Sequence, residues 1–386
     1  MIKSKMLRLA LFTLSPAVFA QTNSQDESEY KLSLTGTSFS YSEVMPVIQT
    51  FGGVIPVAKI GRQTTFSTAP EEGRHALTHN RANLTFERDN FFFEVATRYD
   101  YRIDFTPDAA QLFFLDRAER PVDKDEYVLY FKAKHIRANG VGFGYQFERD
   151  KLSVRFVGHY WDVQYMEDGE LDGVFLANQA DDTFEVTGTL DYTYYQDAIL
   201  DRKNCPKTDP PKAGCHGDWT EDGYGYSVDM LVNYHFAEDW ALQLQVYDLV
   251  NQFKFDKLGR TQGQLDTRTE VFNADGTFSI NPSFRGRYPD GKHKLSVSTQ
   301  LNARVSGVWG IPVWAELYAA NDSYFPSIGV GYQLANWRLE TGYQSGTEAL
   351  LFSIKHPNFK FRIGSETSDL INAQALILDL SLAYQF

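Results

Sequence analysis

The last eleven residues of the chain, LILDLSLAYQF at positions 376–386, alternate between apolar and other side chains. Leucine, tyrosine or phenylalanine stands at every even-numbered position of this stretch, and Asp379, Ser381 and Gln385 stand at odd-numbered positions. Because successive side chains of a β-strand point to opposite faces, this period of two predicts a strand with one apolar and one more polar face.

The same alternation recurs along most of the chain, for example at 93–104. Polar turn sequences such as Arg88-Asp89-Asn90 separate the runs, and connections this short join antiparallel neighbours. Segments 151–166 and 170–179 are interpreted as two strands, and 293–305 as one. We therefore expect one all-β domain, an up-and-down antiparallel meander of about sixteen strands (roughly 14–18).

Length and composition narrow the kind of protein that these strands build. The chain has 386 residues, a formal net charge of −13 and 15% aromatic residues. It contains no apolar run of the roughly 18 residues that a spanning helix needs. The acidic balance argues against nucleic-acid binding, and the aromatic content argues against disorder. A soluble β-sandwich would also alternate. However, long runs with charges of both signs on one face and aromatic ends on the other favour a transmembrane β-barrel.

Residues 1–20 are interpreted as a secretory signal peptide, and 21–386 as the barrel domain. Lys3 and Lys5 are basic, residues 7–14 are mostly apolar, and Ala20 is a small residue at the expected cleavage point. This order of features is typical of an export signal, and the apolar part is too short to span a bilayer.

Cys205 and Cys215 lie in a stretch rich in proline, lysine and glycine. In an exported protein, an oxidising compartment would pair them as a disulfide that holds one loop in shape. The alternative is a metal site that adds His216, although zinc sites generally use closer cysteine spacings. We expect the disulfide, and no metal or other cofactor.

The end of the chain resembles the C-terminal insertion signal of Gram-negative outer-membrane β-barrel proteins. Leu380, Leu382, Tyr384 and the terminal Phe386 carry this resemblance. It implies a location in the cell outer membrane, contact with membrane lipid and lipopolysaccharide, and recognition by periplasmic chaperones and the barrel-assembly machinery. It singles out no particular porin family. An oligomer is also compatible, because a subunit interface would resemble a lipid-facing wall.

The polar faces of the strands are expected to line an aqueous lumen, as in a porin-like pore for small hydrophilic solutes. The pore-lining candidates are Arg98, Asp100, Arg102, Arg285, Arg287, Lys294, Arg304, Arg338, Glu340, Lys360 and Arg362. Cations outnumber acids in the last third of the chain. This basic stripe predicts a preference for anionic or zwitterionic solutes. The alternative is that charges of both signs merely pair within a wet lumen.

Two further segments depart from simple alternation. Residues 44–60 are apolar and do not alternate cleanly, so we expect them to fold inward or form a lid; a misread strand is the alternative. At 247–251 the apolar positions change from even to odd, which predicts a β-bulge.

Other functions remain open at this point. A barrel also serves export or uptake of a polysaccharide or lipid, and some outer-membrane barrels hydrolyse lipids. The eight histidines are scattered, and no Ser–His–Asp arrangement is apparent from spacing. We therefore expect no catalytic residues and no enzyme activity.

Overall fold

The computed structural model describes residues 30–51, 73–117, 120–196, 219–267, 270–274, 276, 283–287 and 291–386. The expected signal peptide and the Cys205–Cys215 disulfide lie outside these ranges. Within them, strands dominate, and the two helices are short, with 5 and 11 residues. Neither helix is long and apolar enough to cross a membrane.

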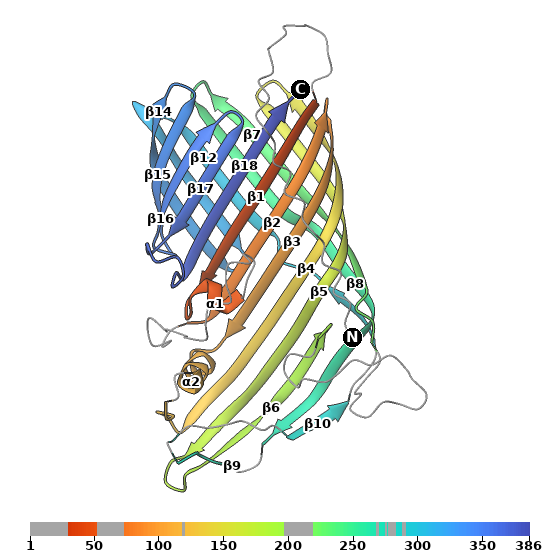
Figure 1. Cartoon of the computed structure of the whole chain (residues 1–386), viewed down its shortest axis with the longest axis vertical. Coiled ribbons are helices and arrows are strands. Elements are labelled where there is room, and N and C mark those ends of the chain that lie inside the picture. Colours follow the sequence, from red (N-terminus) through yellow and green to blue (C-terminus); the bar gives the residue numbers. More distant parts are fainter. Residues whose placement is uncertain are drawn as a thin grey trace, which may run out of the picture.

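Fourteen antiparallel strands close into a barrel, within the range that the sequence predicts (Figure 1). The first and last strands pair over their whole length, from Lys31 opposite Gln385 to Tyr41 opposite Ala375, and this pairing removes any open edge. The barrel strands are β1 (Tyr30–Ser42), β2 (His75–Arg88), β3 (Phe91–Phe105), β4 (Glu126–Arg149), β5 (Leu152–Asn178), β7 (Gly223–Ala237), β8 (Trp240–Asp266), β12 (Gln300–Trp309), β13 (Ile311–Ala320), β14 (Ser323–Leu334), β15 (Trp337–Gln344), β16 (Ala349–His356), β17 (Phe359–Ser365) and β18 (Ala375–Gln385).

One wall of the barrel is much taller than the other (Figure 1). Strands β5 and β8 have 27 residues each, whereas β13–β18 have between 7 and 12. Strand β7 lies between the first parts of β5 and β8, and β6 (Thr183–Tyr194) lies between their second parts. The short strand β9 (Glu270–Val271) pairs with β6, while β10 (Ser283–Arg287) and β11 (Gly291–Leu295) continue along β8.

Two strand boundaries differ from the prediction. Segments 151–166 and 170–179 form the single strand β5, which accommodates Gln164 as an extra residue opposite the step from Arg137 to Ala138. This bulge reverses the alternation and therefore looks like a strand end in the sequence. Conversely, 293–305 is not one strand, because residues 296–299 interrupt β11 and β12.

The two ends of the barrel differ in their connections. At the turn end, tight turns join the strands, and Asp89, Asp150 and Ala335 adopt the positive φ angles that such turns require. Both terminal strands also meet there, where Tyr30 and Phe386 exchange backbone hydrogen bonds of 3.1 and 3.0 Å. The opposite end, here called the loop end, carries longer connections and the taller wall.

Helix α1 (Val47–Phe51) lies against the outer face of the barrel at the loop end. Val47 and Phe51 pack on Ala76 and Ile103. Ile103 is on the same side of β3 as the exposed Phe93, so these contacts are outside the lumen. The expectation that 44–60 folds inward is therefore wrong for residues 44–51, because their apolar side chains find a partner surface outside. Residues 52–60 are not described.

Helix α2 (Pro107–Arg117) covers the outer face of the tall wall. Leu112 and Leu115 pack against Leu129 of β4 and Phe175 of β5. Partial burial alone would raise the pKa of Asp108. Hydrogen bonds from the Val128 amide (3.0 Å) and the Lys124 ammonium (2.9 Å) instead hold that pKa below its usual value.

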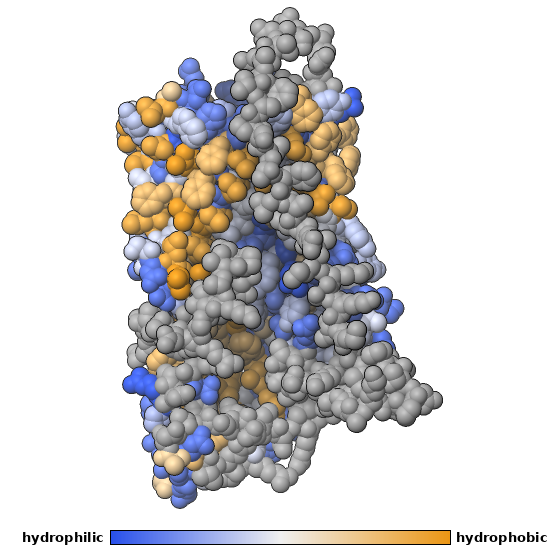
Figure 2. Space-filling model, viewed as in Figure 1, coloured by the Kyte–Doolittle hydropathy of each residue, from blue (hydrophilic) through white to orange (hydrophobic). Residues whose placement is uncertain are grey.

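Apolar and aromatic side chains form a broad surface on the outside of the barrel toward the turn end (Figure 2). Phe143, Ile328 and Tyr332 are 62%, 68% and 66% exposed, although all three are large and apolar or aromatic. Trp309, the last residue of β12 before the tight turn to β13, is 81% exposed. Such a surface with aromatic residues near its edge is typical of barrels that sit in lipid.

Candidate functional site

The inner face of the barrel is packed with side chains that lie across glycines of the wall. A Cβ on Gly140 would meet the Trp161 ring at 2.5 Å, and one on Gly144 would meet the Phe92 ring. Similarly, the Trp314 ring lies on Gly329 and Gly342 of neighbouring strands. The absence of side chains at these positions lets large rings approach the wall closely and fill the lumen.

Ion pairs cross the lumen near its middle. Arg98 of β3 donates from Nη1 and Nη2 to the two carboxylate oxygens of Asp248 on β8, each at 2.9 Å. Arg81 of β2 donates to Asp248 at 2.5 Å and to Asp229 of β7 at 3.1 Å. In the wall, β4 and β5 lie between β3, which carries Arg98, and β7, which carries Asp229. The ion pairs therefore cross the interior of the barrel. Arg81, Arg98, Asp100, Asp229 and Asp248 are here called the crossing layer.

A bulge in β8 places Asp248 in this layer. The pairing of β7 with β8 shifts where Val228 faces Val250 and Met230 faces Val246, which confirms a bulge at 247–251. It adds two residues, so the strand keeps its phase, and the apolar positions change because Phe253 and Phe255 point inward. Asp248 has a positive φ of 56° and is fully buried. Opposite the break at 296–299, the Asn251 amide donates to the Val297 carbonyl and accepts from its N–H, both at 2.8 Å, and so replaces a missing strand pair.

A second set of polar contacts lies beside the crossing layer. The His79 ring nitrogen Nδ1 lies 2.5 Å from Asp100 Oδ1 and 2.6 Å from the Gln300 amide nitrogen. The Tyr318 hydroxyl donates to Gln300 Oε1 at 3.1 Å. Strands β2, β12 and β13 are thereby tied together inside the barrel. The other ring nitrogen of His79, Nε2, is buried and has no hydrogen-bond partner among the described residues.

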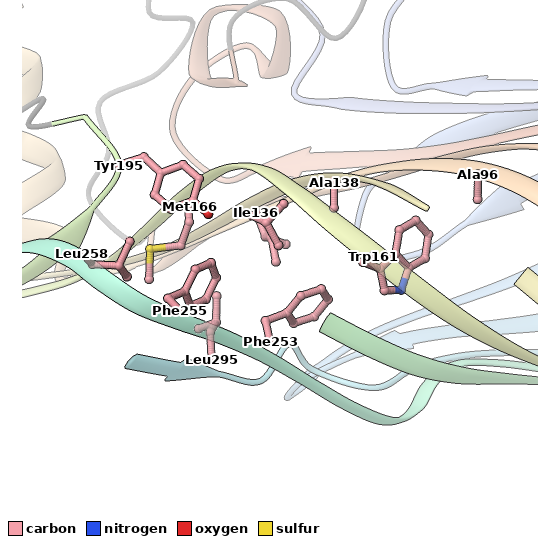
Figure 3. Packing of buried hydrophobic residues seen from close by; sticks show 11 residues of the cluster. Ala96, Ile136, Ala138, Trp161, Met166, Tyr195, Phe253, Phe255, Leu258 and Leu295 are labelled. Atoms are coloured by element: carbon pink, nitrogen blue, oxygen red, sulfur yellow. The ribbon is translucent and has the colours of Figure 1, made fainter. Parts of the chain in front are cut away.

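Apolar side chains pack against the crossing layer on its loop side. Figure 3 shows Trp161, Met166 and Phe253 with their neighbours, pointing toward one another from β5 and β8. The Arg98 guanidinium lies 5.2 Å from the ring centres of both Trp161 and Phe253. These rings exclude water and stabilise the Arg98 cation, so cation–π contacts add to the ion pairs with carboxylates in fixing the crossing layer.

Small cavities follow one another along the lumen. One of about 60 Å³ is lined by His79, Arg102 and Tyr318, among others. The next, of about 90 Å³, is also lined by His79 and Tyr318 and reaches Arg304 toward the turn end. A third cavity of about 340 Å³ opens at the turn end. Since His79 and Tyr318 border both of the first two cavities, a single layer of side chains separates them.

A cluster of charges lines the turn-end half of the lumen. Glu340 meets Arg304 at 2.7 Å, Arg338 at 3.0 Å and Lys355 at 2.9 Å. Glu316 meets Arg304 at 2.9 Å and Arg362 at 2.7 Å, and Asp379 lies 3.7 Å from both Lys360 and Arg362. The basic cluster is defined here as Arg304, Arg338, Lys355, Lys360 and Arg362.

The structure places most of the candidate residues from the sequence on the inner face. Those that lie there are Arg98, Asp100, Arg102, Arg304, Arg338, Glu340, Lys360 and Arg362. Lys294 does not, because its strand neighbours His293 and Leu295 pair with the inward Phe255 and Phe253. The break at 296–299 reverses the phase between Lys294 and Arg304, and therefore Lys294 faces outward. Arg285 and Arg287 belong to β10 on the tall wall, and their side chains are not described.

Sequence reasoning missed the residues that close the lumen. His79 shares the period of two with Arg81 on β2, so the alternation could have placed it inside. Asp248 lies in the bulge of β8, where the alternation of residues does not indicate which face of the strand a side chain is on. Gln300 and Tyr318 were not distinguishable from ordinary wall residues.

Comparison with known proteins gives only distant structural likenesses. No protein-family model and no curated protein matches the chain. Among solved structures, the toluene transporter TbuX of Ralstonia pickettii has 9% identity and a TM-score of 0.40, with 94% of this chain and 90% of that chain covered. The toluene transporter TodX of Pseudomonas putida has 10% identity and a TM-score of 0.38 over the same shares. OccK8 (OprE) of Pseudomonas aeruginosa has 10% identity and a TM-score of 0.21 over 93% and 98%. Likenesses this distant assign neither a family nor a substrate; the chain is a closed antiparallel barrel whose lumen is crossed by ion pairs.

Proposed function

We propose that the chain resides in a bacterial outer membrane and lets small hydrophilic solutes cross through its lumen. Only closed barrels and helices satisfy all backbone hydrogen bonds within lipid, and the exposed apolar surface around this barrel suits a membrane. Barrels of this kind keep short turns on the periplasmic side and long loops outside. The turn end therefore faces the periplasm, and the tall wall faces the exterior.

The observation that carries the proposal is the series of cavities. The cavities of about 60 and 90 Å³ share His79 and Tyr318 in their linings, so these side chains stand at the boundary between them. Side chains reorient far more readily than a strand moves. The described conformation is thus a closed passage that opens when His79 and Tyr318, together with the crossing layer to which Asp100 ties His79, rearrange.

The charges favour anionic or zwitterionic solutes. The turn-end cavity is lined by Arg304, Lys355 and Lys360, and none of its described lining residues is acidic. A wall of one sign in a confined lumen raises the local concentration of the opposite ion. The pairing of many cations with carboxylates weakens this field but does not cancel it.

We also propose that the chain is not an enzyme, and we name the partners that its membrane location implies. We expect membrane lipid and lipopolysaccharide around the barrel, and periplasmic chaperones and the barrel-assembly machinery during its insertion. The two lumen cavities of about 60 and 90 Å³ are too small for a polysaccharide strand or a lipid, which makes export or uptake of such molecules through the lumen the weaker alternative. Lipid hydrolysis by the refolded protein would contradict the assignment.

Current through planar lipid bilayers tests the passage. The refolded full chain is expected to conduct in brief steps, and a variant with a weakened crossing layer, Asp248→Asn, is expected to conduct more often. The reversal potential in a salt gradient reports the preferred sign of ion. A folded Asp248→Asn barrel that passes no current would refute the proposal.

A further inference from the structure

The basic cluster contains more cations than its carboxylates can balance. Five cations, Arg304, Arg338, Lys355, Lys360 and Arg362, surround Glu316, Glu340 and Asp379. If all eight are ionised, five positive charges meet three negative ones and the cluster carries a net charge of +2.

The inner part of the cluster lies away from solvent, whereas the side chains of Arg338, Lys355 and Lys360 are 26%, 28% and 42% exposed. Glu316, Glu340 and Arg362 are 6%, 5% and 6% exposed, and the Trp314 ring centre lies 4.3 Å from the Arg304 guanidinium and 5.8 Å from that of Arg362. An unbalanced charge in such surroundings is costly, since water cannot solvate it fully. An anion that enters the cluster supplies the missing negative charge.

Space for such an anion is present beside the cations. Arg304 and Lys360 line both the 90 Å³ cavity and the 340 Å³ cavity, so they stand at the junction of the two. A volume of 90 Å³ equals roughly three water molecules, which suits an anion of a few non-hydrogen atoms.

Hydrogen-bonding groups continue from the cations toward the crossing layer. The wall of the 90 Å³ cavity includes the amides of Gln243, Gln245 and Asn302. The unpartnered Nε2 atom of His79 belongs to a residue at the far side of the same cavity. A ligand with one charged end and one hydroxyl or amino group would match both parts of this wall.

We propose that Arg304, Lys360 and Arg362, with these amides, form a binding site for a small organic oxyanion that carries a hydroxyl or amino group. The charged end, a carboxylate or a phosphate, lies among the cations, and the other polar group contacts the amides. The site rests on the proposed function, because it names the solute class that the passage takes. A solute from the periplasmic side reaches it through the turn-end cavity.

Titration calorimetry of the refolded full chain in detergent tests the site. Lactate and inorganic phosphate are the anionic probes, and glycerol is the neutral probe of similar size. Saturable heat with either anion and none with glycerol is expected, and the tighter anion identifies the favoured charged group. Glycerol binding as tight as lactate binding would overturn the site.

Two matched variants separate the site from general charge effects. Lys360 is 42% exposed and has one ion pair among the described residues, a long one of 3.7 Å to Asp379, so Lys360→Gln should fold normally. It is expected to weaken anion binding about tenfold, as loss of one charge-assisted hydrogen bond does. Lys294→Gln removes an outward cation and should bind like the parent protein. Equal binding by Lys360→Gln and the parent would refute the site.

Binding and passage are measured independently. A barrel that binds lactate but passes no current, even with Asp248→Asn, would refute the proposed function and leave the site standing. Current without saturable lactate or phosphate binding would overturn the site and leave the passage.

Discussion

Replacing Asp248 with asparagine is expected to loosen the crossing layer while leaving the backbone intact. Asp248 has a φ of 56°, a conformation that asparagine adopts about as readily as aspartate. The substitution keeps the size of the side chain and removes its charge. Any effect therefore reports the ion pairs and not the bulge in β8.

The structure sets the size of the effect. Asp248 is fully buried and accepts three N–H bonds, one from Arg81 at 2.5 Å and two from Arg98 at 2.9 Å. Breaking a buried ion pair costs about 3–5 kcal/mol. Since Arg81 retains Asp229 and Arg98 retains Asp100, we expect the lower end, about 3 kcal/mol. This would shift the equilibrium between closed and open layers about a hundredfold.

Single-channel recording measures this shift as the fraction of time that the passage conducts. With Asp248 neutral, two guanidinium groups in the layer lose a shared counter-charge, so the reversal potential in a KCl gradient should also move toward that of chloride. Asp89→Asn is the matched control, because Asp89 has a φ of 54° and lies in an exposed turn. An Asp248→Asn barrel that is folded and conducts no more often than Asp89→Asn would refute this reasoning.

Three other substitutions or conditions test the packing. Gly140→Ala puts a Cβ 2.5 Å from the indole of Trp161 and should lower the free energy of unfolding by about 1–3 kcal/mol. Gly36→Ala, whose Cβ would have nothing within 4 Å, should leave that free energy unchanged. Equal urea midpoints for the two variants would contradict this prediction. Asn251→Ala loses both bonds to the Val297 backbone and should cost about 2 kcal/mol in the same assay, and an unchanged midpoint would count against the role of the amide. The pKa of Asp108 is lowered, so the stability that its carboxylate gives to α2 is present above the ordinary carboxyl pKa and is lost as the pH falls through the lowered pKa. Hydrogen exchange of the α2 amides should therefore rise only in acid. Exchange that does not depend on pH, after correction for the intrinsic rate, would disprove this role of Asp108.

The inward positions of the regular strands were predictable from residue order. Arg304 and Glu340 fall on the polar side of alternating runs, and the pleat of a strand leaves no choice of face once the apolar side meets lipid. The change of apolar positions at 247–251 marks an irregularity there but not its nature: the bulge adds two residues and keeps the phase, and the apolar positions change because Phe253 and Phe255 fill the lumen. Lys294 was assigned to the wrong face because the interruption at 296–299 leaves no comparable mark in the sequence.

The sequence by itself determined the antiparallel meander, because a period of two and short turns are both local, and the barrel could be predicted from it. It did not determine the strand ends near 166–170 and 296–299. Only the tertiary structure decided which charges meet. Arg81 and Asp248 are 167 residues apart and come from strands that do not pair with each other. Their contact depends on the curvature of the closed wall, on the bulge in β8 and on the flat glycine surfaces that let large rings fill the lumen. Such distances across a barrel arise from closure as a whole, and no local pattern of residues encodes them.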